Sequence, residues 1–93
     1  IMLLDEPTSS LDPGATAELR HTLRKIAARG KSLIMITHNL SDIIPEIERV
    51  ILIRHGKVVG DGSKKQMLTS AALSQLFGVS LEVFRRDGYY YCW

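Results

Sequence analysis

The segment Ile1-Met2-Leu3-Leu4-Asp5-Glu6-Pro7 opens the chain and decides its fold class. Four apolar residues run directly into two adjacent carboxylates, and a short continuous apolar run is typical of a strand buried on both faces in a parallel sheet. Open α/β sheets bind ligands at the carboxyl ends of their strands, which is where Asp5 and Glu6 stand. Because carboxylates are costly to desolvate unless a cation or a substrate needs them, the acid pair indicates a binding site.

The composition restricts the class of protein. The chain has 93 residues, of which 45% are hydrophobic and 24% are charged, and these values are ordinary for one globular domain. A net charge of +2 is too small to indicate a nucleic acid or an anionic membrane as a partner. Cys92 is the single cysteine, so no internal disulfide can form. No apolar run approaches the ~20 residues that a membrane span requires.

Capping signals and hydrophobic periodicity predict the elements that follow. Asp12 and Pro13 form a helix start, with Asp12 as the N-cap of a helix over residues 13–29. A second buried strand is expected next, then a short helix, a hairpin around His55-Gly56, two more helices, and a hairpin around Asp87-Gly88. The expected ranges are 33–37 for the strand, 40–48 for the short helix, 50–54 with 57–60 for the first hairpin, 63–68 and 71–77 for the helices, and 81–86 with 89–93 for the last hairpin. Pro45 is expected either to kink the short helix or to break it.

The triplet Gly30-Lys31-Ser32 copies the end of a phosphate-binding loop, G-x-x-x-x-G-K-[ST]. The position five residues before Gly30 is Lys25 and not glycine. The triplet also stands between a helix and a strand, whereas a phosphate loop needs a strand followed by a helix whose N-terminus faces the anion. We therefore interpret Gly30 as the residue that ends a helix.

Several short motifs, in order, resemble those of ATP-binding cassette (ABC) ATPases. Asp5-Glu6 resembles the Walker B motif, Ser9-Ser10-Leu11-Asp12 resembles the D-loop, and Ile36-Thr37-His38 resembles the segment of the switch histidine. Residues 49–62 look like the hairpin that follows in that family. The resemblance covers about the first two thirds of the chain. It implies an α/β fold with a partial P-loop NTPase (ABC ATPase) core of parallel strands and helices, followed by C-terminal β-hairpins.

The same resemblance implies roles for individual residues, with ATP and Mg²⁺ as cofactors. Asp5 would hold Mg²⁺, through a water molecule, because Mg²⁺ keeps several of its waters. Glu6 would act as the general base or position the attacking water, and His38 would contact the γ-phosphate. Ser10 and Asp12 belong to the D-loop, which in related ATPases reaches across a dimer toward the phosphate loop of the partner.

Each of these residues also has a structural interpretation. The acid pair can be the solvated end of a strand followed by a turn at Pro7, and His38 can be a loop or helix-capping residue. Asp12 caps a helix whether or not it has a second role. The cations and aromatic residues of the C-terminal hairpin could stack on nucleic acid, but a hairpin that packs one aromatic face on the domain is the favoured interpretation. His21 and His55 are expected to be ordinary surface residues.

A complete cassette is much longer and begins with the glycine-rich phosphate loop, which this sequence lacks together with the glutamine loop and the LSGGQ-type signature. We therefore expect the chain to be the C-terminal portion of a nucleotide-binding domain. It should form a single domain over residues 1–93, with residues 1–62 as the catalytic-core portion and residues 63–93 as C-terminal helices and a hairpin. By itself the chain is expected to be inactive and to bind Mg-ATP poorly.

The family topology places the strand that bears the phosphate loop between residues 33–37 and residues 50–54. Without it, two strand edges would carry unpaired backbone groups. The sequence therefore predicts that these strands pair directly, that the chain oligomerises, or that it depends on a further N-terminal segment.

The leading functional hypothesis is ATP hydrolysis that powers transport through a membrane permease. The complete protein would pair with a second ABC ATPase subunit and would work in the cytoplasm, at the inner face of the cell membrane, without nucleic acid. The alternative is a non-catalytic cassette segment that acts as a self-association or interaction module. Cassette-like ATPases of DNA repair and chromosome structure are less favoured, because no heptad repeat or basic patch is present.

Overall fold

The structure is a computed structural model that describes residues 1–93. Its contacts divide the chain into two compact units, Ile1–Glu46 and Ile47–Trp93. No helix is both long and apolar enough to cross a membrane. The elements in chain order are β1 (Met2–Asp5), α1 (Pro13–Ala28), β2 (Leu33–Ile36), the 3-10 turn η1 (Leu40–Asp42), β3 (Arg49–Arg54), β4 (Lys57–Ser63), α2 (Lys64–Met67), α3 (Ser70–Phe77), β5 (Val83–Arg86) and β6 (Tyr89–Cys92).

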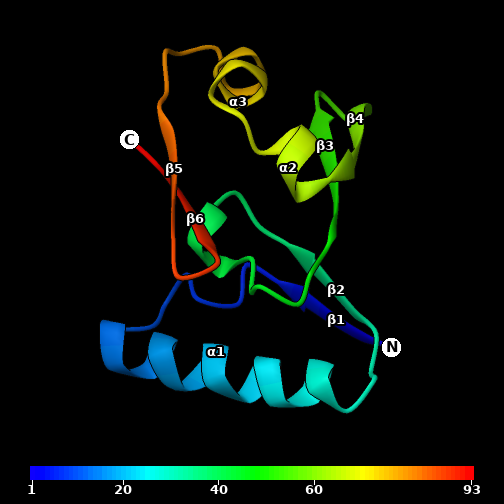
Figure 1. Cartoon of the computed structure of the whole chain (residues 1–93), viewed down its shortest axis with the longest axis vertical. Coiled ribbons are helices and arrows are strands. Elements are labelled where there is room, and N and C mark those ends of the chain that lie inside the picture. Colours follow the sequence, from blue (N-terminus) through cyan, green and yellow to red (C-terminus); the bar gives the residue numbers. More distant parts are fainter. The chain divides into compact units, whose positions relative to one another are not determined.

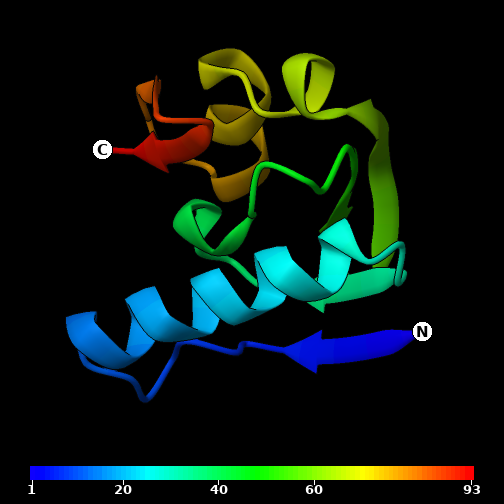
Figure 2. The same cartoon turned by 60° about the horizontal axis from the view of Figure 1, so that its bottom comes forward.

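The first unit is built on a β-α-β arrangement. Strands β1 and β2 pair in parallel, in a register that sets Met2 opposite Leu33 and Asp5 opposite Ile36. Helix α1 connects them and runs alongside the pair in the opposite direction (Figures 1 and 2). The carboxyl ends of both strands consequently lie at the same edge, as the α/β prediction requires.

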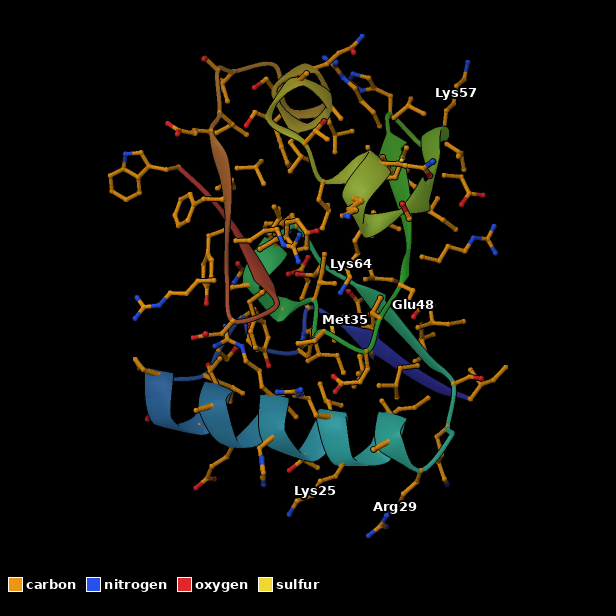
Figure 3. The ribbon with its side chains drawn as sticks, viewed as in Figure 1. Lys25, Arg29, Met35, Glu48, Lys57 and Lys64 are labelled. Atoms are coloured by element: carbon orange, nitrogen blue, oxygen red, sulfur yellow. The ribbon has the colours of Figure 1, made fainter.

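Helix α1 begins and ends where its capping residues predict. The Asp12 carboxylate accepts a hydrogen bond of 2.8 Å from the Ala15 amide, which satisfies one of the free N–H groups of the first turn. Its apolar face buries Leu23, which is 3% exposed, while the side chains of Lys25 and Arg29 project on the side away from the strands (Figure 3). Gly30 follows with a φ of 82° and ends the helix, so the Gly30-Lys31-Ser32 triplet is no phosphate loop.

The short helix predicted over residues 40–48 is wrong. Only η1 is helical, and Ile43 already has extended backbone angles, with φ −75° and ψ 101°. Pro45 explains the early stop, because proline disfavours a helical conformation at the residue before it and offers no amide hydrogen for the next helical bond. The segment is nevertheless well anchored, since Ile44 is fully buried.

The prediction that residues 1–4 are buried on both faces is also wrong. Leu3 and its register partner Ile34 share one face of the β1–β2 pair, and their exposed fractions are 64% and 52%. Ile36 lies on the same face and is 53% exposed. Within the first unit α1 is the single α-helix, whereas the sequence pattern assumes a covering layer on both faces of the pair.

The second unit begins with the hairpin of β3 and β4. Its turn places His55 at φ 51° and Gly56 at φ 72°, the two positive φ values that a type I′ turn requires. A bulge leaves Val59 unpaired between the Leu52–Gly60 and Ile53–Val58 partners. The hairpin contacts α2 and α3. The sequence places its residues with the catalytic-core portion, whereas in the structure they belong with the C-terminal helices. That the whole chain forms one domain stays a prediction.

Exposed charges also stabilise this hairpin. Arg49 and Asp61 lie on neighbouring strands and form two hydrogen bonds, of 2.9 and 2.7 Å. This hydrogen-bonded pair lowers the pKa of the Asp61 carboxyl and raises that of the Arg49 guanidinium.

Short helices and a terminal hairpin complete the second unit. Ser63 and Gln66 form a reciprocal capping box at the start of α2, and Gly78 ends α3 in the left-handed conformation, with φ 73°. The Ser74 hydroxyl holds the chain beyond α3 through two hydrogen bonds to the backbone of Leu81, of 2.8 and 3.1 Å. Strands β5 and β6 pair around a turn at Asp87-Gly88, as predicted.

The aromatic residues of the terminal hairpin divide between its faces. Tyr90 is buried, with 5% exposed, and the Arg85 guanidinium lies 5.2 Å from the centre of its ring. On the other face, Phe84 and Tyr91 stack with ring centres 5.6 Å apart. The burial of Tyr90 fits the predicted packing of one aromatic face.

The three strand pairs form separate two-stranded sheets. The three expectations for residues 33–37 and residues 50–54 stay predictions. Within the first unit, β2 pairs with β1 alone, and the exposed side chains of Ile34 and Ile36 lie on β2.

Candidate functional site

Glu6 and His38 meet at the carboxyl ends of β1 and β2. The Nδ1 atom of His38 lies 2.6 Å from Oε1 of Glu6, and the His38 backbone amide donates a hydrogen bond of 3.2 Å to the same oxygen. The imidazole is 78% exposed and the Glu6 side chain 30% exposed. A carboxylate that is partly sheltered and a ring that reaches into solvent therefore form one contact.

The backbone of β1 and β2 explains how this contact forms. The Glu6 amide donates a hydrogen bond of 2.7 Å to the Ile36 carbonyl, which extends the parallel ladder one residue beyond β1. Glu6 then adopts a φ of 48°, a left-handed conformation that costs a residue with a side chain about 1 kcal/mol. Such strain is concentrated at functional sites, where the surrounding structure maintains it.

Asp5 precedes Glu6 and lies opposite Ile36 in the register, with its side chain exposed. No group of three or more histidine, cysteine, aspartate or glutamate residues that could hold a metal ion is present. Mg²⁺ does not require such a group, because it takes one or two carboxylates and keeps water and phosphate oxygens as its other ligands. A single exposed carboxylate at this strand end therefore fits the predicted role of Asp5.

Ser10 and Asp12 lie apart from the Glu6–His38 contact. Both are exposed, in the turn that leads from β1 into α1. The Asp12 side chain caps α1 through the Ala15 amide, so its structural role is established by its geometry. The role of both residues toward a nucleotide or a second subunit stays a prediction.

Three polar residues beside the site were missed by the sequence reasoning. The Asp42 side chain is buried, with 2% exposed, and its Oδ1 accepts a hydrogen bond of 2.5 Å from the Thr8 hydroxyl. Its Oδ2 accepts one of 2.7 Å from the Thr37 hydroxyl. Thr8 and Asp42 are 34 positions apart, so no spacing rule could have joined them. The available signal was that both threonines stand within two residues of a predicted site residue.

The geometry of Glu6 and His38 determines which chemistry these two side chains can support. A carboxylate and an imidazole in contact can position and deprotonate a water molecule, and an exposed ring nitrogen can bind a phosphoryl oxygen. The sequence contains no glycine-rich phosphate loop, and the backbone amides that hold a triphosphate in such a loop are therefore absent from these residues. His21 and His55 are both exposed, on α1 and in the β3–β4 turn.

Comparisons with known proteins agree with the sequence motifs. The protein family described as "AAA domain, putative AbiEii toxin, Type IV TA system" matches residues 1–41. A "Putative ABC transporter ATP-binding protein" of Methanosarcina mazei is 40% identical over 67 residues, which are 72% of this chain and 23% of that protein. The "Hemin import ATP-binding protein HmuV" of Plesiomonas shigelloides is 33% identical over 85 residues, which are 91% of this chain and 32% of that protein.

A solved structure shows the same fold. The structure described as "An inward-facing conformation of a putative metal-chelate type ABC transporter" matches with a TM-score of 0.75 over 97% of this chain and 37% of its own, at 22% sequence identity. The expected fold class, a partial P-loop NTPase core, is thereby confirmed. The chain spans between about a quarter and a third of the length of these relatives.

Proposed function

We propose that this chain, which is similar over most of its length to ABC transporter ATP-binding proteins, is part of an ABC ATPase domain and supplies the hydrolytic edge of an ATP site that powers transport. The single observation that carries this proposal is the 2.6 Å contact between Glu6 and His38 at the ends of two parallel strands. Ligands of open α/β sheets bind at that edge.

Glu6 is the residue that we assign to the attacking water. Phosphoryl transfer depends mainly on placement and on stabilisation of charge, so one carboxylate beside the water is chemically sufficient. As a general base, such a group contributes a rate factor of about 10²–10⁴. The hydrogen bond from the His38 amide to Glu6 Oε1 supports this assignment, because it fixes the carboxylate in one position.

The contact with Glu6 also determines what His38 can do. An ionised carboxylate only accepts hydrogen bonds, so the proton of a neutral His38 ring belongs on Nδ1. The exposed Nε2 is then an acceptor in the neutral ring and a donor in the imidazolium. His38 therefore donates to a phosphoryl oxygen when its ring carries a second proton.

The residues present also fit Mg²⁺ and ATP as cofactors of the complete domain. Asp5 would hold the ion through water, and the ion would supply charge neutralisation at the phosphates. The phosphate cradle and the remaining contacts to ATP would come from parts of the domain outside these residues.

Substitution of Glu6 in a complete ATPase that contains this segment tests the proposal. We expect Glu6→Gln to reduce ATP hydrolysis at least 100-fold while ATP binding remains, because the amide keeps the shape of the side chain but cannot accept a proton. Glu18→Gln is the matched control, since Glu18 is an exposed glutamate of α1. Unchanged hydrolysis by the Glu6→Gln enzyme would remove Glu6 from the mechanism.

The partners and the location follow from the family and are part of the proposal. The complete protein would pair with a second ABC ATPase subunit through the D-loop that contains Ser10 and Asp12, and would dock on a membrane permease from the cytoplasmic side. The relative from Plesiomonas shigelloides is named for hemin import, and another, from Mycoplasmopsis synoviae, is named as an energy-coupling factor transporter subunit.

A second candidate function is self-association of this chain as a non-catalytic module. The observation that favours it is the free edge of β2, with Ile34 and Ile36 each about half exposed. Unpaired strand edges with apolar side chains are templates for pairing with another chain. Both functions are compatible with the same fold, and they differ in what the isolated chain does in solution.

A further inference from the structure

We propose that Asp42 is a positioning residue for the candidate site, which it organises through the hydroxyls of Thr8 and Thr37. These three residues, here called the Asp42 clamp, join the loop after β1 to the loop after β2. The inference rests on the proposed function of Glu6 and His38, and it assigns to Asp42 the task of holding that pair together.

The connectivity of the clamp is the main evidence. Thr8 is two residues beyond Glu6, and Thr37 is the residue before His38. Both hydroxyls donate to the same carboxylate, at 2.5 and 2.7 Å. The Glu6–His38 contact and the clamp thus close one ring of linked residues, so that the site residues cannot separate far while both threonines are held.

On the Thr37 side, further hydrogen bonds connect this closed set of linked residues to the backbone beside His38. The Thr37 Oγ1 atom accepts a hydrogen bond of 2.9 Å from the Asn39 amide. Asn39 in turn caps η1, whose Asp42 amide donates a hydrogen bond of 3.0 Å to the Asn39 carbonyl. His38 is therefore placed between two residues whose positions both depend on Asp42.

Burial of the Asp42 carboxylate costs free energy, because the group loses its hydration, and packing alone would not favour it at this position. Its side chain is among the most buried of the chain, with 2% exposed. A carboxylate is rarely buried unless its oxygens are hydrogen-bonded, and charge-assisted bonds from hydroxyls are short and strong. An apolar side chain of similar size would fill the same space without this desolvation cost. The acid at position 42 therefore serves to hold the two loops in place.

Nuclear magnetic resonance of the imidazole nitrogens of the 93-residue chain provides the test, with no nucleotide present. In the unaltered chain, Glu6→Ala should shift the ring ¹⁵N signals of His38 and leave those of His21 and His55 in place. In an Asp42→Ala background, the same Glu6 substitution should no longer shift the His38 signals, because the contact is already lost. This coupling between two positions would not change if Asp42 contributed to stability alone.

Variants of the two threonines keep the proposal testable if Asp42→Ala does not fold. Thr8→Val and Thr37→Val each preserve shape and remove one hydroxyl, and the double variant should abolish the response of His38 to Glu6→Ala. Thr22→Val is the matched control, since the Thr22 hydroxyl bonds only to the Glu18 carbonyl of its own helix, at 3.0 Å. A folded double variant in which His38 responds to Glu6→Ala as fully as in the unaltered chain would overturn the proposal.

The outcome is independent of the proposed ATPase activity. If the response of the His38 signals depends on Asp42 but the Glu6→Gln enzyme still hydrolyses ATP, the proposal for the Asp42 clamp is supported and the proposed function is contradicted. If the Glu6→Gln enzyme is inactive but the response of the His38 signals does not depend on Asp42, the proposed function is supported and the proposal for the Asp42 clamp is contradicted.

Discussion

The Nδ1 atom of His38 lies 2.6 Å from the Oε1 atom of Glu6, although the two residues come from separate loops. Because the carboxylate can only accept, this distance assigns the proton of the neutral imidazole to Nδ1. The Nε2 atom then faces solvent, in a ring that is 78% exposed. One contact thus fixes the orientation of the histidine and leaves the nitrogen that can reach a ligand.

The first prediction concerns the tautomer of His38. At a pH where the ring is neutral, its proton should reside on Nδ1, because the Glu6 carboxylate holds it there. Long-range ¹⁵N–¹H correlation spectra report which ring nitrogen is protonated, and His21 and His55 serve as references within the same sample. A neutral His38 with its proton on Nε2 would show that the contact with Glu6 is not maintained in solution.

The second prediction concerns binding of Mg-ATP to the isolated chain. We expect a dissociation constant of about 1 mM or weaker, because the chain lacks the glycine-rich loop whose backbone amides hold the phosphates. Isothermal titration calorimetry measures this directly, and Mg-ADP under the same conditions is the control for the γ-phosphate. Micromolar binding of Mg-ATP would mean that these residues contain a phosphate site that the sequence does not reveal.

The third prediction compares two glycines at opposite ends of α1. Gly30→Ala should reduce the free energy of unfolding by about 1–2 kcal/mol, because Gly30 has a φ of 82° and a Cβ disfavours that conformation. Gly14→Ala should be neutral or stabilise by up to about 1 kcal/mol, since alanine favours helix interiors. A Cβ at Gly14 would meet only the Asp12 Oδ1 atom, at an ordinary 3.5 Å.

Urea titration followed by far-ultraviolet circular dichroism measures both glycine variants. The comparison is internal, because Gly14 lies in the first turn of α1 and Gly30 lies directly after its C-terminal end. Equal stability of the two variants would contradict the assignment of Gly30 to the left-handed end of α1.

The fourth prediction concerns self-association through β2. We expect the chain to form dimers or larger species as its concentration rises, because β2 offers a free edge with exposed Ile34 and Ile36. Ile34→Lys should shift the distribution toward monomer, since a charged side chain at an edge disfavours pairing with a second strand. Sedimentation velocity at several concentrations measures this effect.

Ala17→Lys adds the same charge at an exposed position of α1 and is the control for nonspecific repulsion. If both lysine variants reduce association equally, β2 is not the contact. If the unaltered chain is monomeric at every concentration, the second candidate function loses its support.

Local signals in the sequence predicted most elements of the fold. Asp12 and Gly30 mark the two ends of α1, and the pairs His55-Gly56 and Asp87-Gly88 mark the hairpin turns, because these residue types satisfy backbone requirements that act over a few positions. The prediction was wrong for residues 40–48, where only η1 is helical. Pro45 ended the helix there, because its backbone constraint outweighed the helical pattern of the neighbouring residues. The exposure of Leu3 was unforeseen, because burial depends on a second layer that the pattern cannot display.

The sequence by itself determined that an acid pair and a histidine follow two apolar strands, and hence that a parallel pairing would bring them to one edge. Only the tertiary structure decided that Glu6 and His38 touch, and that Asp42 joins the loops on both sides of them. The physical reason is how far apart in the sequence the interacting residues lie. Strand formation, capping and turns depend on neighbours in the chain, whereas the bond between Thr8 and Asp42 joins positions 34 residues apart and exists only when the parallel ladder has set its register.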